Sequence, residues 1–114
     1  MNWADPFFIT LILIGPSFIL AGGILYKWPP KKINKFFGYR TKRSRKSKEI
    51  WDYAQRHSAI ETIKLGLIAM TLSLAGLFWH LNEHISLVLG IVTVIGMTIM
   101  LFIRTENALR KRFD

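Results

Sequence analysis

Apolar residues gather in three long runs, and short polar segments between and after these runs carry nearly all of the charge. The first run, residues 7–26, has about 20 residues and no charge, which is enough for an α-helix to cross a hydrocarbon core of about 30 Å. The second, residues 61–81, is charged only near its start, and the third, residues 85–103, is uncharged. This pattern predicts an all-α integral membrane protein, a bundle of three transmembrane helices in a single domain spanning residues 1–114.

The segments between the runs differ greatly in length. Residues 82–84 can form only a tight turn, so the second and third helices should make an antiparallel hairpin. Residues 27–60 are long enough for a basic loop followed by a helical stem that runs directly into the second transmembrane helix. Either Ser44 or Ser47 can cap this stem, with Glu49 in its first turn, where a negative charge is favourable. Residues 104–114 form a basic tail.

Helical spacing within the stem predicts which residues face the rest of the molecule. One face collects the larger apolar and small residues, and the charged residues and Gln55 fall mostly elsewhere. The inward face is predicted to contain Ile50, Trp51, Ala54, His57, Ser58 and Glu61.

The positive charge indicates the topology. The formal net charge is +9, and every Lys and Arg lies between residues 27 and 64 or after residue 103. Because positive residues are enriched on the cytoplasmic side, the N-terminus is predicted outside and the loop, stem and tail inside a multi-pass protein of the plasma membrane. Part of the loop is dense enough to attract anionic lipids, and it lacks a motif for reading nucleic acid. This predicted lipid surface contains Lys42, Arg43, Arg45, Lys46 and Lys48.

Candidate chemistry is sparse. There is no cysteine, which excludes disulfides and thiolate catalysis. His57 is predicted on the opposite side of the membrane from His80 and His84, and no Ser, Asp and His set converges. We therefore expect neither an enzyme nor a cofactor or metal site. Glu61 and Lys64 lie one turn apart and are expected to form an interfacial pair instead of a proton pathway.

Small residues predict how the helices pack. A stripe on the second helix, spaced by three and four residues, would let another backbone approach closely. The first and third helices offer matching small residues, which favours packing within one chain and leaves a homodimer seam as the alternative. The stripe contains Gly66, Ala69, Ser73 and Gly76, and its counterparts are Gly15, Gly22, Ser86 and Gly90.

The most distinctive segment is Asn-Lys-Phe-Phe-Gly-Tyr-Arg-Thr at residues 34–41, followed by Ser and by Glu-x-Trp-x-x-Ala at residues 49–54. This pattern resembles the SdpI family of small bacterial membrane proteins over residues 29–56, and the three-helix layout also fits that family. The resemblance marks the motif loop and stem as the candidate binding site. Its residues are Asn34, Gly38, Tyr39, Arg40, Thr41, Ser44, Glu49 and Trp51.

The resemblance implies a role in immunity. The member after which the family is named protects its producer from a secreted toxic peptide and also binds a transcriptional repressor at the membrane. The resemblance thus implies a bacterial cell membrane protein that confers resistance to a membrane-active toxic peptide. The alternatives are a membrane-anchored docking protein for a cytosolic transcriptional regulator, and a membrane-integrity factor.

Two interpretations of the motif loop remain open from its residues. In the first, Gly38 permits a tight turn, Asn34 and Thr41 satisfy turn backbone groups, and Trp51 packs over the loop, so the motif pins the loop to the stem. In the second, the motif contacts a ligand or partner directly. Arg40 suits either, because its planar fork fits a carboxylate such as that of Glu49 or Asp52, or a lipid phosphate.

Overall fold

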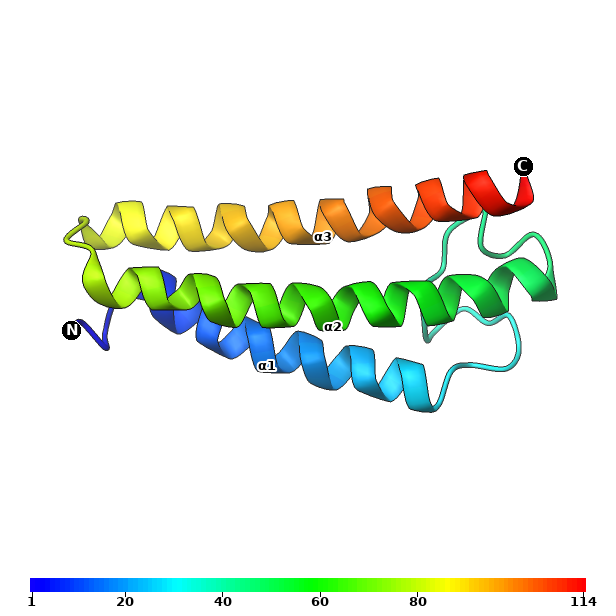
Figure 1. The fold of residues 1–114 in the computed structure, drawn as a ribbon, viewed down its shortest axis with the longest axis horizontal. Coiled ribbons are helices and arrows are strands. Elements are labelled where there is room, and N and C mark those ends of the chain that lie inside the picture. Colours follow the sequence, from blue (N-terminus) through cyan, green and yellow to red (C-terminus); the bar gives the residue numbers. More distant parts are fainter.

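The computed structural model describes residues 1–114 and contains three helices and no strands. Helix α1 is Pro6–Lys27, α2 is Lys48–Phe78 and α3 is Glu83–Phe113. Figure 1 shows them side by side in an elongated bundle of 49 × 24 × 21 Å, with α2 running antiparallel to both neighbours. Each helix is long and apolar enough to cross a membrane, which confirms the predicted three-helix membrane fold.

The helix boundaries depart from the sequence prediction at two places. Helix α2 includes the predicted stem, which is confirmed as continuous with the second apolar run, but it ends at Phe78, before residue 81. Helix α3 continues past the apolar run through the basic tail to Phe113. The tail stays helical because Thr105 and Leu109, one turn apart, are fully buried against the rest of the chain.

The helix starts follow capping chemistry. The Asp5 carboxylate accepts from the amide of Phe8, and Pro6 occupies the first turn of α1, where its missing amide costs nothing. Of the two candidate caps for α2, the structure uses Ser47, whose hydroxyl accepts from the amide of Ile50.

The small-residue stripe of α2 packs within the chain. Gly15 and Gly66 face each other so closely that a Cβ on Gly66 would lie 2.6 Å from the Gly15 carbonyl oxygen. Ala69, Ser73 and Gly76 are likewise buried, which confirms the predicted packing between helices.

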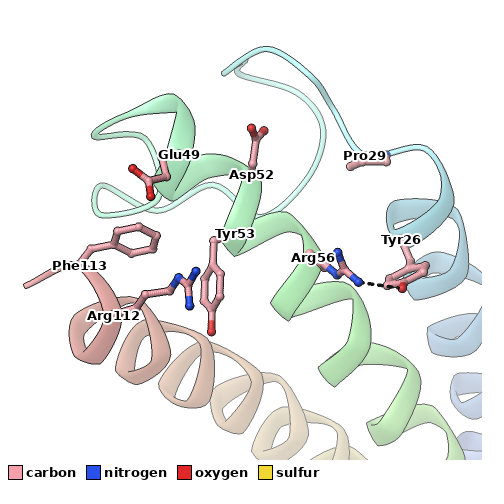
Figure 2. Close-up of a pocket in the computed structure, with 8 residues that line it drawn as sticks. All are labelled: Tyr26, Pro29, Glu49, Asp52, Tyr53, Arg56, Arg112 and Phe113. Atoms are coloured by element: carbon pink, nitrogen blue, oxygen red, sulfur yellow. Dashed lines mark hydrogen bonds between the residues drawn. The ribbon is translucent and has the colours of Figure 1, made fainter.

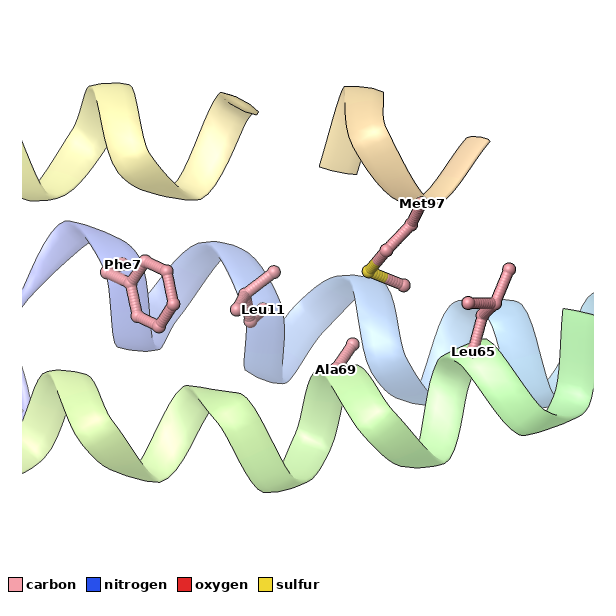
Figure 3. Packing of buried hydrophobic residues seen from close by; sticks show 5 residues of the cluster. All are labelled: Phe7, Leu11, Leu65, Ala69 and Met97. Atoms are coloured by element: carbon pink, nitrogen blue, oxygen red, sulfur yellow. The ribbon is translucent and has the colours of Figure 1, made fainter. Parts of the chain in front are cut away.

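The apolar core lies where all three helices meet (Figure 3). The side chains of Phe7 and Leu11 from α1, Leu65 and Ala69 from α2, and Met97 from α3 form one buried cluster. The outer faces of the helices expose Leu, Ile and Val side chains, as expected for surfaces that contact lipid. This core fixes the ends of the helices relative to one another and therefore positions the loop at the basic end.

Candidate functional site

The motif loop is fastened to the stem at two points. The first is Trp51, whose side chain is fully buried and whose indole Nε1 donates to the carbonyl of Pro30 at 2.8 Å. Burying the ring and satisfying its only donor lets an aromatic side chain serve as an anchor without an unpaired polar group. The start of the loop is therefore held against α2.

The second fastening point is Gln55. Its fully buried amide accepts from the Tyr39 amide at 2.6 Å and donates to the Tyr39 carbonyl at 2.7 Å. Gly38, with φ of 98°, allows this approach, because a Cβ there would collide with the Gln55 amide. The prediction that Gln55 lies off the inward face was wrong, because Gln55 follows Trp51 by four residues and lies buried on the same face.

Local turns complete the loop. The Asn34 side chain accepts from the amides of Phe36 and Phe37, at 2.9 and 2.8 Å. The buried Ser44 hydroxyl accepts from the Thr41 amide at 2.8 Å, and the Ser44 amide donates to the Thr41 hydroxyl at 3.1 Å. These bonds fix the backbone on both sides of residue 40.

Arg40 lies between these bonded residues, but its own side chain is exposed and forms no ion pair. The pairs considered with Glu49 and Asp52 are not formed: Glu49 is exposed without an ion pair, and Asp52 pairs with Lys48. The guanidinium is thus presented from a backbone held at Tyr39 and Thr41.

The tail of α3 closes the other side of the loop. The Tyr39 ring packs on Phe102 with centroids 5.5 Å apart, and Leu109 joins Tyr39 in a buried cluster. Burial raises the pKa of the Tyr39 hydroxyl well above its usual value, and the neighbouring Glu106 carboxylate raises it further. The tail was expected only as a basic segment, and its part in this cluster was missed. The four-residue spacing of Thr105 and Leu109 was the available signal.

A groove of about 550 Å³ lies on the face of the stem opposite to Trp51 and Gln55 (Figure 2). Its floor is one helical face of α2, and its walls come from the ends of α1 and α3. Two arginines lie over aromatic rings: Arg56 is 5.6 Å from the Tyr26 ring centre, and Arg112 is 4.7 Å from that of Tyr53. The groove is lined by Tyr26, Pro29, Glu49, Asp52, Tyr53, Arg56, Arg112 and Phe113.

The predicted cationic surface is divided by its contacts. Arg43 pairs with Glu106 at 3.4 Å and with Asp114, Arg45 donates to the Thr41 carbonyl, and Lys48 pairs with Asp52. Lys42 and Lys46 stay exposed and form no ion pair. Only part of this surface is therefore free to attract an external anion.

At the other end of the bundle, Asp5 forms a buried junction of all three helices. Its carboxylate accepts from the Ser86 hydroxyl at 2.6 Å and from the Trp79 indole at 3.2 Å. Burial alone would raise the pKa of Asp5, but hydrogen bonds from Ser86, Phe8 and Trp79 outweigh it and lower the pKa below its usual value. Ser86 was predicted only as a packing residue, and its bond to Asp5 was not predicted.

The expected pair of Glu61 with Lys64 was wrong. Glu61 is buried and faces α3, where Arg104 binds both carboxylate oxygens at 2.9 and 3.2 Å, whereas Lys64 is exposed. Arg104 reaches Glu61 from the facing helix α3, and no ion pair joins Glu61 to Lys64. The bidentate geometry favours arginine as the partner.

Three apolar helices, closed at one end by a buried carboxylate and at the other by an anchored basic loop, define a multi-pass membrane protein. Residues 31–103 match the model of the SdpI/YfhL protein family, and the chain belongs to this family. The Bacillus subtilis (strain 168) protein YfhL is 34% identical over 99 residues, which cover 86% of this chain and 84% of the relative. No solved structure matches the chain.

Proposed function

We propose that this protein protects a bacterial cell membrane against a membrane-active toxic peptide, and that Arg40 acts in this protection. The observation that carries the proposal is the contrast between Arg40 and the loop around it. Gln55 holds Tyr39, and Ser44 holds Thr41, yet the Arg40 side chain holds nothing. Because its backbone is already ordered, Arg40 loses only side-chain entropy when it binds, which favours a contact role.

The SdpI resemblance supports the type of activity. The named member of that family protects its producer from a secreted toxic peptide, and the present chain carries the motif that surrounds Arg40. The anchored residues of the motif fit the interpretation that the motif pins the loop to the stem. Arg40 fits the interpretation that the motif contacts a ligand or partner directly.

Survival under membrane-active peptides tests the proposal. We would express wild type, Arg40→Ala and Lys35→Ala in a sensitive bacterium and record survival and membrane potential at equal membrane abundance. Lys35 is the matched control, because it is an exposed cation in the same loop. Protection by wild type and Lys35→Ala, with loss in Arg40→Ala, is the expected result. Equal protection by all three would remove the role of Arg40.

We also propose that the basic end faces the cytoplasm. Loop, stem start and tail all gather at one end of the bundle, which supports an outside N-terminus through the positive-inside rule. Because the chain contains no cysteine, Asn2→Cys and Lys35→Cys each introduce a single label site. In intact cells an impermeant maleimide should label Asn2→Cys alone; labelling of Lys35→Cys alone would invert the topology.

Docking of a cytosolic regulator is a second candidate, favoured by the groove in Figure 2. Its two carboxylates, two arginines and three aromatic rings could receive a segment with charged and apolar side chains. A photo-crosslinking residue in place of Tyr53 should capture a cytosolic protein, whereas one in place of the exposed Leu87 on α3 should not. Equal capture at both positions would argue against the groove.

A further inference from the structure

A second recess at the basic end has only charged walls. It measures about 390 Å³ and is formed by the loop and the tail of α3 together. Four cationic side chains surround it and one carboxylate belongs to its wall. The lining residues are Lys42, Arg43, Lys46, Glu106 and Arg110.

The charges of this recess are not balanced within the chain. Arg43 is committed to Glu106 and Asp114, but Lys42, Lys46 and Arg110 form no ion pair. Three like charges around one recess repel one another, and an anion placed among them would relieve that repulsion. The unpaired charge therefore favours an anionic occupant.

The recess is also set in place by buried structure. Lys42 and Lys46 flank a turn whose centre is the fully buried Ser44, bonded to Thr41. Arg110 follows the fully buried Leu109 on the helical tail, and Glu106 ties that tail to Arg43. The cations therefore converge from two anchored segments, unlike those of a mobile basic tail.

The position along α3 brings the recess to the level of lipid headgroups. The apolar run ends at residue 103, and at about 1.5 Å per residue Glu106 lies about 5 Å and Arg110 about 10 Å beyond it. Headgroups occupy roughly 5–8 Å outside the hydrocarbon on each side. Long cationic side chains readily extend toward this layer.

We propose that this recess binds the phosphate headgroup of one anionic phospholipid, with Lys42, Lys46 and Arg110 as its ligands. This inference is independent of the proposed protective function. It replaces a diffuse attraction of the whole basic loop by a single site with defined walls. The exposed lysines at 31, 32 and 35 belong to the same loop but line no part of the recess.

Native mass spectrometry of the full chain in mild detergent tests the site. The protein is titrated with phosphatidylglycerol, with phosphatidylethanolamine of the same acyl chains, and with soluble glycerol phosphate. Three forms are compared: wild type, the recess triple Lys42→Gln, Lys46→Gln, Arg110→Gln, and the outer triple Lys31→Gln, Lys32→Gln, Lys35→Gln. Both triples lose the same charge, so general electrostatic attraction falls equally in both.

Wild type is expected to retain one phosphatidylglycerol in preference to phosphatidylethanolamine. The recess triple should bind it at least tenfold more weakly, given the attraction of each cation near a lipid surface, and the outer triple within about twofold of wild type. Lys46→Gln alone, with circular dichroism to confirm the fold, should weaken binding about fivefold. Equal loss in both triples, absence of a lipid preference, or glycerol phosphate bound as tightly as the lipid would each overturn the proposal.

Discussion

The two ends of the bundle treat polar groups in opposite ways. At the hairpin end one carboxylate, Asp5, is buried and receives neutral donors from the turn and from α3 as well as its own helix. At the basic end the groups that anchor the loop are neutral, namely Trp51, Gln55 and Ser44, and most charges of the loop stay exposed.

This difference gives the two ends different roles: one closes the helix bundle, and the other exposes charged side chains. A buried carboxylate with all its donors nearby is a stable junction that offers nothing to a partner. Neutral anchors under a cationic surface cost less desolvation and leave the charges free to act. The hairpin end therefore holds the helices together, and the basic end is the part suited to binding.

The largest effect is expected when the loop anchor is removed. Trp51→Ala deletes a fully buried aromatic ring and leaves the Pro30 carbonyl without its donor, which should lower the free energy of unfolding by about 3–5 kcal/mol. Denaturant titration in mixed micelles measures it. Trp28→Ala is the control, because Trp28 is 63% exposed and should change stability by less than about 1 kcal/mol. Similar losses in the two variants would show that the loop is not anchored through Trp51.

The hairpin end can be opened by a single methyl group. A Cβ at Gly76 would lie 2.5 Å from Asp5 Oδ2 and 2.8 Å from the Phe8 amide nitrogen, so Gly76→Ala should destabilise the fold by about 2 kcal/mol. The same substitution at Gly96 meets no atom within 4 Å and should stabilise α3 slightly. Thermal unfolding in detergent compares them. A stable Gly76→Ala would mean that the junction yields without loss.

At both ends the sequence predicted the local features but not the long-range contacts. The three spans, the stem with its serine cap and the α1–α2 packing follow from hydropathy, capping chemistry and small-residue spacing, which are local signals. The bonds from Gln55 to Tyr39 and from Trp79 and Ser86 to Asp5 join residues far apart in the chain or around a turn. No periodicity encodes which distant backbone group a buried amide will meet, so these contacts needed the fold.

The charge of Asp5 gives a pH-dependent prediction. Because hydrogen bonds lower the folded-state pKa of this carboxyl, its stabilising effect is present above the unfolded pKa of about 4 and is lost as the pH falls through the folded value. Asp5→Asn should cost about 2 kcal/mol at neutral pH. It should also remove this contribution to the pH dependence below pH 4. Unfolding titrations between pH 2 and 7 measure both effects. An acid dependence unchanged in Asp5→Asn would assign it to other carboxyls.

The smallest effect is expected at Ser47, which only caps a helix, whereas Asp5 also joins the three helices. Ser47 and Asp5 cap their helices in the same way, each accepting from an amide three residues on, but Ser47 is exposed and has no further partner. Ser47→Ala should therefore cost about 1 kcal/mol, the usual contribution of a cap alone. Ser47→Asp is the matched control and should restore stability, because a carboxylate also caps and suits the helix dipole. A loss of about 2 kcal/mol or more in Ser47→Ala, with no restoration in Ser47→Asp, would show that Ser47 does more than cap α2.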